Sequence, residues 1–353
     1  MRFSKLFVFV VVMLAGAGLK AQDIHFSQFY LSPLNLNPAM TGAMDCNIRL
    51  VANYRNQWGS VLGANAYNTY SVSYDQKVAV GRYDFVGFGA TFWNDTAGEV
   101  DFSTLTAKGS ASYLKRMGGD RTTAHYLVAG AEFGFAQRSI DFIKAQWGTQ
   151  HDGFGGFDGS LTPGEPGLNP SFTFVDLGAG LMWYSALRND NSFYMGAAFH
   201  HLNSINNSFQ DGGFDEYYSR LTFHAGGEIN FDGRAGLSPG VIVMSQGPSL
   251  QVNSGMSLKF LLGSRRDQQA FHIGVWNRIS KQDDGIDGTN GPLLMDAIIL
   301  STRFDYQTFS LGFSFDVNVS SLSPASNNAG GPEFAMVYKI CQKLNRGPNC
   351  FRF

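Results

Sequence analysis

Residues 47–58 read NIRLVANYRNQW, and apolar or aromatic residues take every second position in the first part of this stretch. These positions are Ile48, Leu50, Ala52 and Tyr54. Polar residues occur between them, at Arg49, Asn53 and Arg55. Alternation over about ten residues predicts a β-strand whose two faces meet different surroundings.

The same pattern recurs to the end of the chain. Further candidate strands lie at 66–76, 84–93, 101–115, 123–138, 171–187, 192–202, 217–231, 236–245, 251–262, 269–278, 292–303, 306–318 and 333–342. Together with 47–58 they make about 14 strands, each about ten residues long or longer. Strands of this length with two unlike faces are typical of transmembrane β-barrels.

The composition agrees with a barrel. The chain of 353 residues has 42 Gly and 31 Phe, and only 15% of its residues are charged, against about 25% in a soluble domain. Its net charge of −2 and the lack of a basic cluster argue against a nucleic-acid partner. We therefore predict an all-β protein, a transmembrane antiparallel β-barrel. A secreted β-sandwich or lectin-like domain is the alternative.

The first residues indicate export. Arg2 and Lys5 precede an apolar run from Leu6 to Leu14, and small residues follow up to Ala21. This pattern is typical of a secretory signal peptide, and the run is too short for a membrane span of about 20 residues. We expect residues 1–21 to be a signal peptide and the protein to reach the outer membrane of a Gram-negative cell.

The connections support the barrel. The four longest fall near 139–170, 203–216, 279–291 and 319–332, and all of them are odd-numbered in the predicted strand order. Outer-membrane barrels have short periplasmic turns and longer extracellular loops. We expect the even-numbered turns, both termini and a tail at 343–353 to be periplasmic, and the barrel to span 46–342.

Residues 25–42, HFSQFYLSPLNLNPAMTG, fit neither a strand nor a long helix, because Pro33 and Pro38 interrupt them. We expect residues 22–45 to plug the lumen or cap its periplasmic mouth; contact with a partner is the alternative reading. The candidate residues for either role are Phe26, Gln28, Phe29, Tyr30, Pro33, Asn37, Pro38 and Gly42. Candidates in the first strand and lumen are Arg49, Tyr54, Arg55, Gln57, Trp58, His201 and Asn203, with Arg303 as a further lumen arginine. We expect few charges on the lumen face.

The sequence predicts no chemistry. His200 and His201 are adjacent in a predicted strand, so they should point to opposite faces and bind no metal together. The Asp-Gly loops at 151–160 and 282–291 lack EF-hand spacing, which favours solvated loops over calcium sites. No nucleophile, zinc or phosphate-loop motif occurs. We therefore expect no enzyme activity, no cofactor and no metal site.

Three cysteines allow a disulfide, because exported proteins meet an oxidising compartment. Cys341 with Cys350 closes a short loop in the tail and is the pairing we favour. Cys46 with Cys341 is the competitor, because they flank the first and last strands, which are neighbours in a closed barrel.

The segment FSQFYLSPLNLNPAMTG and the following RLVANYRNQW resemble the start of the PorP/SprF family of outer-membrane proteins. The matching positions are Phe26, Ser27, Gln28, Asn37, Pro38, Ala39 and Gly42, then Tyr54, Arg55, Gln57 and Trp58. Later landmarks are FHHLN at 199–203, HAGG at 224–227, PGVIVMSQGPSLQVNSG at 239–255, FSFDVNVSSL at 313–322 and the Cys341…Cys350 tail. The chain departs from the family at Ser32, Pro332 and Phe351, which weakens transfer of individual residue roles.

The resemblance implies a function in the type IX secretion system of Bacteroidota. Members of the family work with large secreted proteins, often adhesins, that carry a type-B C-terminal domain. They help to secrete such a partner or anchor it at the cell surface, in some cases for gliding motility, and they act with the secretion machinery. A porin or transporter for small solutes is the alternative function for a barrel of this size.

Overall fold

The computed structural model describes residues 23–341, apart from 121, 152, 154–155, 162–163, 165–166, 232–233, 263–268, 282–290 and 322. The predicted signal peptide, the tail at 343–353 and most of the predicted loop 282–291 lie outside the described residues. Among the described residues, no helix is long and apolar enough to cross a membrane.

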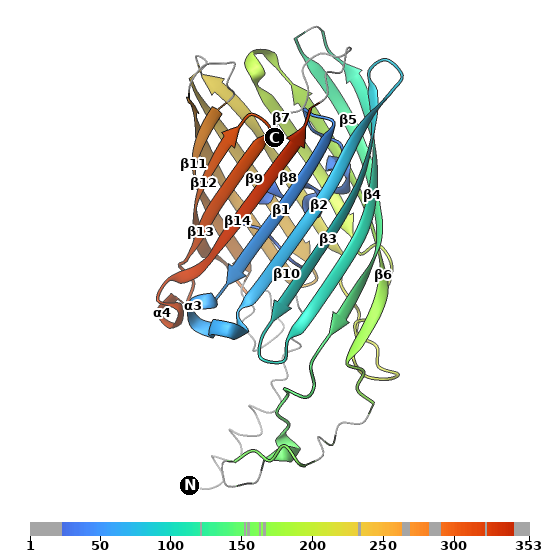
Figure 1. The fold of residues 1–353 in the computed structure, drawn as a ribbon, viewed down its shortest axis with the longest axis vertical. Coiled ribbons are helices and arrows are strands. Elements are labelled where there is room, and N and C mark those ends of the chain that lie inside the picture. The colour runs from blue at the N-terminus through green and yellow to red at the C-terminus, as the bar shows by residue number, and fades with distance from the viewer. Residues whose placement is uncertain are drawn as a thin grey trace.

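The described residues form a closed antiparallel barrel of fourteen strands in chain order, in which β1 pairs with β14 (Figure 1). The strands are β1 (Ile48–Gln57), β2 (Tyr67–Val80), β3 (Asp84–Ala97), β4 (Phe102–Gly118), β5 (Ala124–Ser139), β6 (Ser171–Ala186), β7 (Ser192–His200), β8 (Arg220–Phe231), β9 (Ala235–Gln246), β10 (Ser249–Leu262), β11 (Gln269–Lys281), β12 (Leu293–Tyr306), β13 (Phe309–Asn318) and β14 (Ala329–Ile340). The predicted fold class is confirmed, and every predicted strand corresponds to an observed one.

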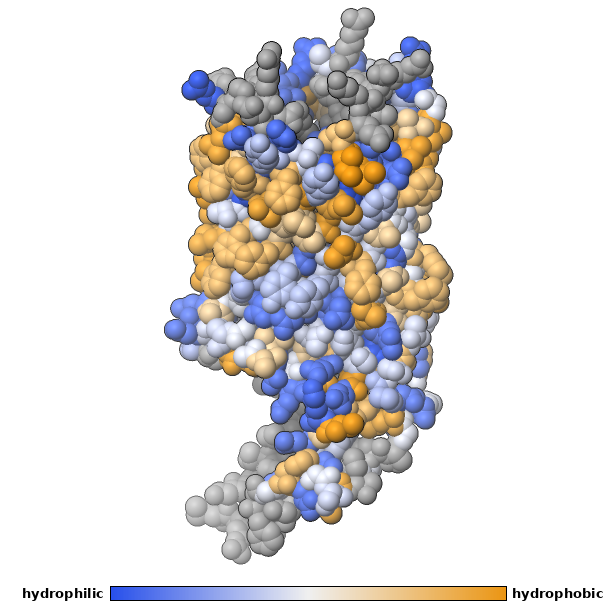
Figure 2. All heavy atoms as spheres, viewed as in Figure 1, coloured by the Kyte–Doolittle hydropathy of each residue, from blue (hydrophilic) through white to orange (hydrophobic). Residues whose placement is uncertain are grey.

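The outer face of the barrel is apolar. Alternate residues of the strands expose large apolar side chains, among them Phe88, Phe133, Leu181, Val275 and Leu300. Figure 2 shows apolar residues, in orange, over much of the visible face of the wall, with hydrophilic residues gathered toward both ends of the barrel. Such an apolar surface is what a barrel presents to lipid.

The lumen face is rich in charges, so our expectation of few charges there is wrong. The charged side chains occur in close pairs, such as Arg49–Asp75 at 2.8 Å, Arg55–Asp316 at 3.0 Å and Lys108–Asp176 at 2.7 Å. A buried charge is tolerated when it is paired and hydrogen-bonded. The sequence of one strand does not reveal these pairs, because the acidic residue and its basic partner belong to different strands.

The two ends of the barrel differ in their connections. The odd-numbered connections include the long ones at 58–66, 140–170, 201–219, 282–292 and 319–328, whereas the even-numbered turns stay short, as at 81–83 and 307–308. Figure 1 shows α3 (Gly59–Leu62), α4 (Ser323–Ser326) and the β5–β6 connection together at the lower end. By the rule for outer-membrane barrels, we assign this end to the outside and call it the outer end. The other end, with the short turns, is the periplasmic end.

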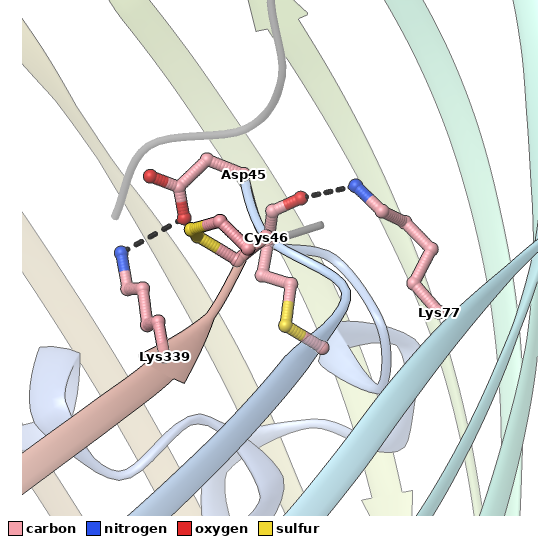
Figure 3. The surroundings of a disulfide bond; sticks show 6 residues. Asp45, Cys46, Lys77 and Lys339 are labelled. Carbon is pink, nitrogen blue, oxygen red and sulfur yellow. Dashed lines mark hydrogen bonds and ion pairs between the residues drawn. A yellow bond between two sulfur atoms is a disulfide. The ribbon is translucent and has the colours of Figure 1, made fainter. Parts of the chain in front are cut away.

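A disulfide joins Cys46 to Cys341 at the periplasmic end, across the seam between β1 and β14 (Figure 3). The pairing that we favoured, Cys341 with Cys350, is therefore wrong in this structure, and the competitor is present. The physical reason is the barrel closure, which brings residues 295 positions apart to a Cα–Cα distance of 4.3 Å. Cys350 itself lies outside the described residues.

The disulfide should hold the seam closed when the barrel is heated. We expect Cys46→Ser to lower the free energy of unfolding by about 2–4 kcal/mol, the usual effect of losing a disulfide. The temperature at which the protein loses the fast migration of a folded barrel on a gel measures this change. Cys350→Ser is the matched control and should leave that temperature unchanged; equal effects of the two variants would contradict the assignment.

Candidate functional site

Residues 23–46 lie inside the barrel. Figure 1 shows the short helices of this segment, in blue, surrounded by strands. They are η1 (Phe29–Leu31), α2 (Pro33–Leu36) and η2 (Pro38–Met40). The exposed fraction is 4% for Phe26, 3% for Phe29 and 3% for Leu34. We call residues 23–46 the lumen segment.

The two prolines explain why the lumen segment has only short helices. Pro33 and Pro38 each stand at the start of a helix, where their missing N–H costs nothing. Asn37 ends α2 and caps η2, because its side-chain oxygen accepts a hydrogen bond from the N–H of Ala39 at 2.8 Å. Its amide group also donates to the carbonyl oxygens of Leu181 and Ala197 in the wall, each at 3.2 Å. The irregular backbone is thus satisfied inside protein, as membrane depth requires.

A buried charge cluster on β14, β13 and β1 holds the segment near its start. Glu333 accepts hydrogen bonds from the backbone N–H groups of Ser27 and Gln28, at 2.7 and 2.8 Å. The Ser27 hydroxyl donates to Asp316 at 2.8 Å, and Arg55 donates to Asp316 at 3.0 Å. Hydrogen bonds to charged groups are worth more than neutral ones, about 1.5–3 kcal/mol each. This cluster therefore fixes the segment to the wall.

A second anchor holds the segment toward the periplasmic end. Asp75 accepts from the N–H of Gly42 at 2.7 Å, and Arg49 donates to the carbonyl oxygen of Met40 at 3.0 Å. Lys77 donates to the carbonyl oxygen of Met44 at 2.6 Å (Figure 3). The chain then enters the disulfide and β1, so this end of the segment is held covalently as well.

Glycines on the lumen face make room for the segment. A Cβ at Gly130 would lie 2.5 Å from backbone atoms of Pro38 and Ala39. A Cβ at Gly87 would lie 2.3 Å from the carbonyl oxygen of Thr41. Because no side chain fits at these distances, the backbone of the segment touches the backbone of the wall at these points.

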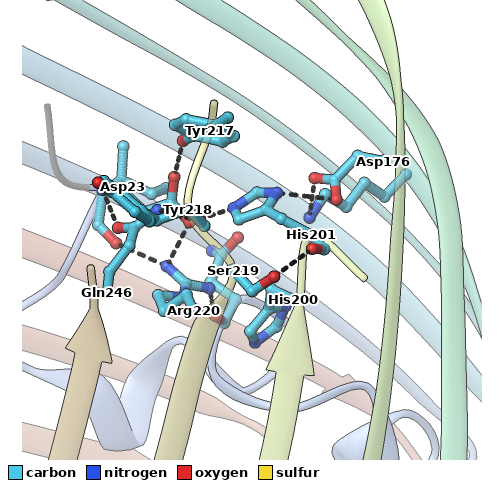
Figure 4. Close-up of polar contacts among 12 residues, drawn as sticks. Asp23, Asp176, His200, His201, Tyr217, Tyr218, Ser219, Arg220 and Gln246 are labelled. Atoms are coloured by element: carbon cyan, nitrogen blue, oxygen red, sulfur yellow. Dashed lines mark hydrogen bonds and ion pairs between the residues drawn. The ribbon is translucent and has the colours of Figure 1, made fainter. Parts of the chain in front are cut away.

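A third anchor lies at the outer end (Figure 4). The Asp23 carboxylate is buried and accepts from His201 at 2.6 Å, from Arg220 at 3.1 Å and from the Tyr217 hydroxyl. The backbone N–H of Asp23 donates to the side chain of Gln246 at 3.0 Å. We call Asp23 with His201, Tyr217 and Arg220 the outer latch. The lumen segment therefore reaches the outer end and is not confined to the periplasmic mouth, as a periplasmic cap would be.

The histidine pair corrects another expectation. His200 ends β7 facing the lumen, where it bonds Glu132 at 2.8 Å. His201 has φ of 56°, so the alternation of the strand stops there and its ring also turns inward, to Asp23 and to Asp176 at 2.9 Å. The two rings do not point to opposite faces. Among the described residues, no group of three or more His, Cys, Asp or Glu is placed to hold a metal.

The other predicted site residues lie in different parts of the barrel. Arg49 and His201 contact the lumen segment, as described above, and Arg55 donates to the carbonyl oxygen of His25 at 2.6 Å. Tyr54 lies on the outer face against Tyr70, with ring centroids 4.9 Å apart. Trp58 and Asn203 belong to the connections. The backbone N–H of Trp58 donates to the carbonyl oxygen of Gly330 at 2.9 Å, and the side-chain amide of Asn203 donates to the carbonyl oxygen of Val175 at 2.8 Å. Gln57 is the last residue of β1, and Arg303 pairs with Asp305 at 2.7 Å.

The acidic residues of the site were missed. Asp23 of the segment accepts hydrogen bonds from the wall, whereas Asp75, Asp316 and Glu333 of the wall accept them from the segment. The alternation of apolar residues marks none of these carboxylates as a site residue. Their position in the strands could have identified three of them. Asp75, Asp316 and Glu333 occupy lumen-facing positions once the register of the strands is known.

The outer latch should depend on pH. Burial alone would lower the pKa of His201, but the carboxylates of Asp23 and Asp176 outweigh it and hold the pKa above its usual 6.5. Burial would raise the pKa of Asp23, but His201 and Arg220 hold it well below 3.8. Burial keeps the pKa of Tyr217 well above 10, so that hydroxyl stays protonated. The His201 contribution is complete below about pH 6.5 and is lost as pH rises through the raised pKa; the Asp23 contribution is lost only in acid.

We therefore expect the start of the segment to loosen when the pH is raised from 6 to 9. Amide hydrogen exchange of residues 23–32, corrected for its intrinsic pH dependence, measures this change. The variant His201→Gln should lose the response, because its side chain does not titrate. A response of the same size in His201→Gln would show that another group controls it.

The geometry above describes a membrane barrel with an occupied lumen, and the sequence comparison identifies the kind of barrel. The family model of the type IX secretion system membrane protein PorP/SprF matches residues 18–338. The chain belongs to the PorP/SprF family. It is thus an outer-membrane protein of a type IX secretion system family. None of the curated proteins compared with it matches the sequence.

The barrel is also similar to solved structures, all at low identity. CdiB from Escherichia coli is 8% identical with a TM-score of 0.47, and the match covers 82% of this chain and 63% of CdiB. The toluene transporter TodX of Pseudomonas putida is 8% identical with a TM-score of 0.45, covering 92% and 95%. The monoaromatic hydrocarbon channel CymD is 14% identical with a TM-score of 0.43, covering 88% and 93%. The chain thus spans less than two thirds of the length of CdiB.

Proposed function

We propose that this PorP/SprF protein binds a large, adhesin-like secreted partner with a type-B C-terminal domain. It helps to secrete that partner or to anchor it at the cell surface, which in a gliding bacterium of the Bacteroidota would serve motility. Membership of a secretion-system membrane family also suggests a non-enzymatic role.

The observation that carries this proposal is the occupied lumen. A porin needs a continuous polar path, whereas here the lumen segment bonds to strands around the wall, from β1 and β2 to β8 and β14. We infer that the segment acts as a plug. A closed barrel of a secretion system is better suited to holding a protein than to passing solutes, so a porin is the second candidate function.

Purification in mild detergent from native outer membranes tests the proposal. An affinity-tagged copy of the protein is isolated, and every protein that co-purifies with it is identified by mass spectrometry. We expect a very large secreted protein with a C-terminal secretion domain, in stable complex. A matched preparation of an unrelated outer-membrane barrel controls for adhesion to detergent micelles. A barrel that purifies without such a protein would overturn stable anchoring.

A further inference from the structure

The two ends of the lumen segment are held in different ways. The periplasmic end continues into β1 and is tied by the Cys46–Cys341 disulfide. The contacts described for the other end are noncovalent, chiefly the outer latch, the hydrogen bond of Asp23 to Gln246 and the charge cluster around Ser27 and Gln28. Ion pairs and hydrogen bonds can open and close again, so the end at Asp23 is the movable one.

The surroundings of Asp23 place it at the outer end. His201 directly follows β7, Arg220 begins β8 and Gln246 ends β9. All three residues flank odd-numbered connections, β7–β8 and β9–β10. The first described residue of the segment therefore lies at the outer mouth, and the rest of the segment lies between it and the periplasmic end.

The latch also ties the segment to one particular connection. His201 and Tyr217 belong to the β7–β8 connection at 201–219, and the Ser219 hydroxyl bonds the carbonyl oxygen of His201 at 2.8 Å. Any displacement of this connection therefore moves two of the three side chains that hold the Asp23 carboxylate. The same connection exposes Phe214, at 72%, on the outside.

We propose that the Asp23 end of the lumen segment faces the cell exterior and that the outer latch couples the β7–β8 connection to the plug. A surface-exposed polypeptide that displaces this connection would release the first half of the segment, whereas the disulfide retains the second half. That this polypeptide is the secreted partner rests on the function proposed above. The orientation and the coupling do not depend on it, and both are tested without any partner.

Orientation is tested with single cysteines in a Cys350→Ser background, in which the other two cysteines are bonded to each other. Ile24→Cys reports on the segment, Phe214→Cys on the outer end and Tyr83→Cys on a periplasmic turn; Ile24 is half-buried and Tyr83 is 40% exposed. We expect a membrane-impermeant maleimide to label Ile24→Cys and Phe214→Cys on intact cells, and Tyr83→Cys only after permeabilisation. Labelling of Ile24→Cys only after permeabilisation would overturn the orientation.

Coupling is tested by amide hydrogen exchange in the purified barrel. Asp23→Asn removes the charge at the centre of the latch, and Asp215→Asn removes an exposed charge from the same connection as a control. We expect Asp23→Asn to speed exchange at residues 24–32 at least about tenfold, which corresponds to about 1.4 kcal/mol, and to leave residues 38–44 unchanged. Unchanged exchange at 24–32, or an equal effect of Asp215→Asn, would overturn the latch. Either result leaves the co-purification test of the proposed function intact.

Discussion

Deleting residues 25–42 is expected to leave a folded barrel in the outer membrane that no longer retains the secreted partner proposed above. The wall should survive because its buried charges also pair with each other. Arg49 keeps Asp75, at 2.8 Å, and Asp316 keeps both Arg55 and Arg278, at 3.0 and 2.8 Å. Removing the segment therefore leaves few buried charges without an oppositely charged partner.

Two measurements on the variant that lacks residues 25–42 distinguish an effect on barrel folding from an effect on partner retention. Heat-modifiable migration on a gel reports whether the barrel folds, and the amount of partner on intact cells reports retention. We expect folding to persist and retention to fall to background. Loss of folding would show that the segment is a structural core, and full retention by a folded barrel would exclude the segment from partner handling.

The second large effect is expected at Gly130. A valine there would place its Cβ 2.5 Å from the backbone of Pro38 and Ala39, which real Cβ atoms do not approach. Overpacking of this kind costs about 1–3 kcal/mol, and the segment is expected to move before the hydrogen-bonded strand does. We expect Gly130→Val to raise the fraction of molecules whose segment is displaced from the lumen about 10- to 100-fold. Frequent channel openings in planar bilayers would report this displacement.

Gly109→Val is the matched control. Gly109 lies in β4, beside β5, and a Cβ there would meet only the carbonyl oxygen of Phe133, at 3.9 Å. The two variants add the same side chain to neighbouring strands of the same wall. Equal channel activity in both would show that openings come from a loosened wall and not from the segment.

The sequence predicted the barrel well because the barrel depends on a periodic pattern. Alternation over ten or more residues, short even-numbered turns and an apolar outer band all follow from one physical demand, a wall between lipid and lumen. The boundaries moved mainly where one residue changed the backbone, as at His201, whose positive φ ends β7 two residues before the predicted end at residue 202.

The site was predicted in outline only. The prolines and aromatic residues of 25–42 marked a segment without regular structure, and Arg49 and Arg55 followed from the alternation. Asp316 and Glu333 did not, because their partners Ser27 and Gln28 lie about three hundred positions away, at separations of 289 and 305. The disulfide pairing was predicted wrongly for the same reason. The short loop between Cys341 and Cys350 favours that pair, and only closure of the barrel brings Cys46 beside Cys341.

The most direct test of a barrel closed by its lumen segment is the ion conductance of the purified intact protein in planar bilayers. The occupied lumen predicts no steady conductance at pH 6, with the bilayer resistance unchanged after insertion. The deletion of residues 25–42, inserted in the same way, should produce large, stable conductance steps. A steady open conductance of the intact protein, equal to that of the deletion, would contradict the account, because the lumen segment would then close nothing.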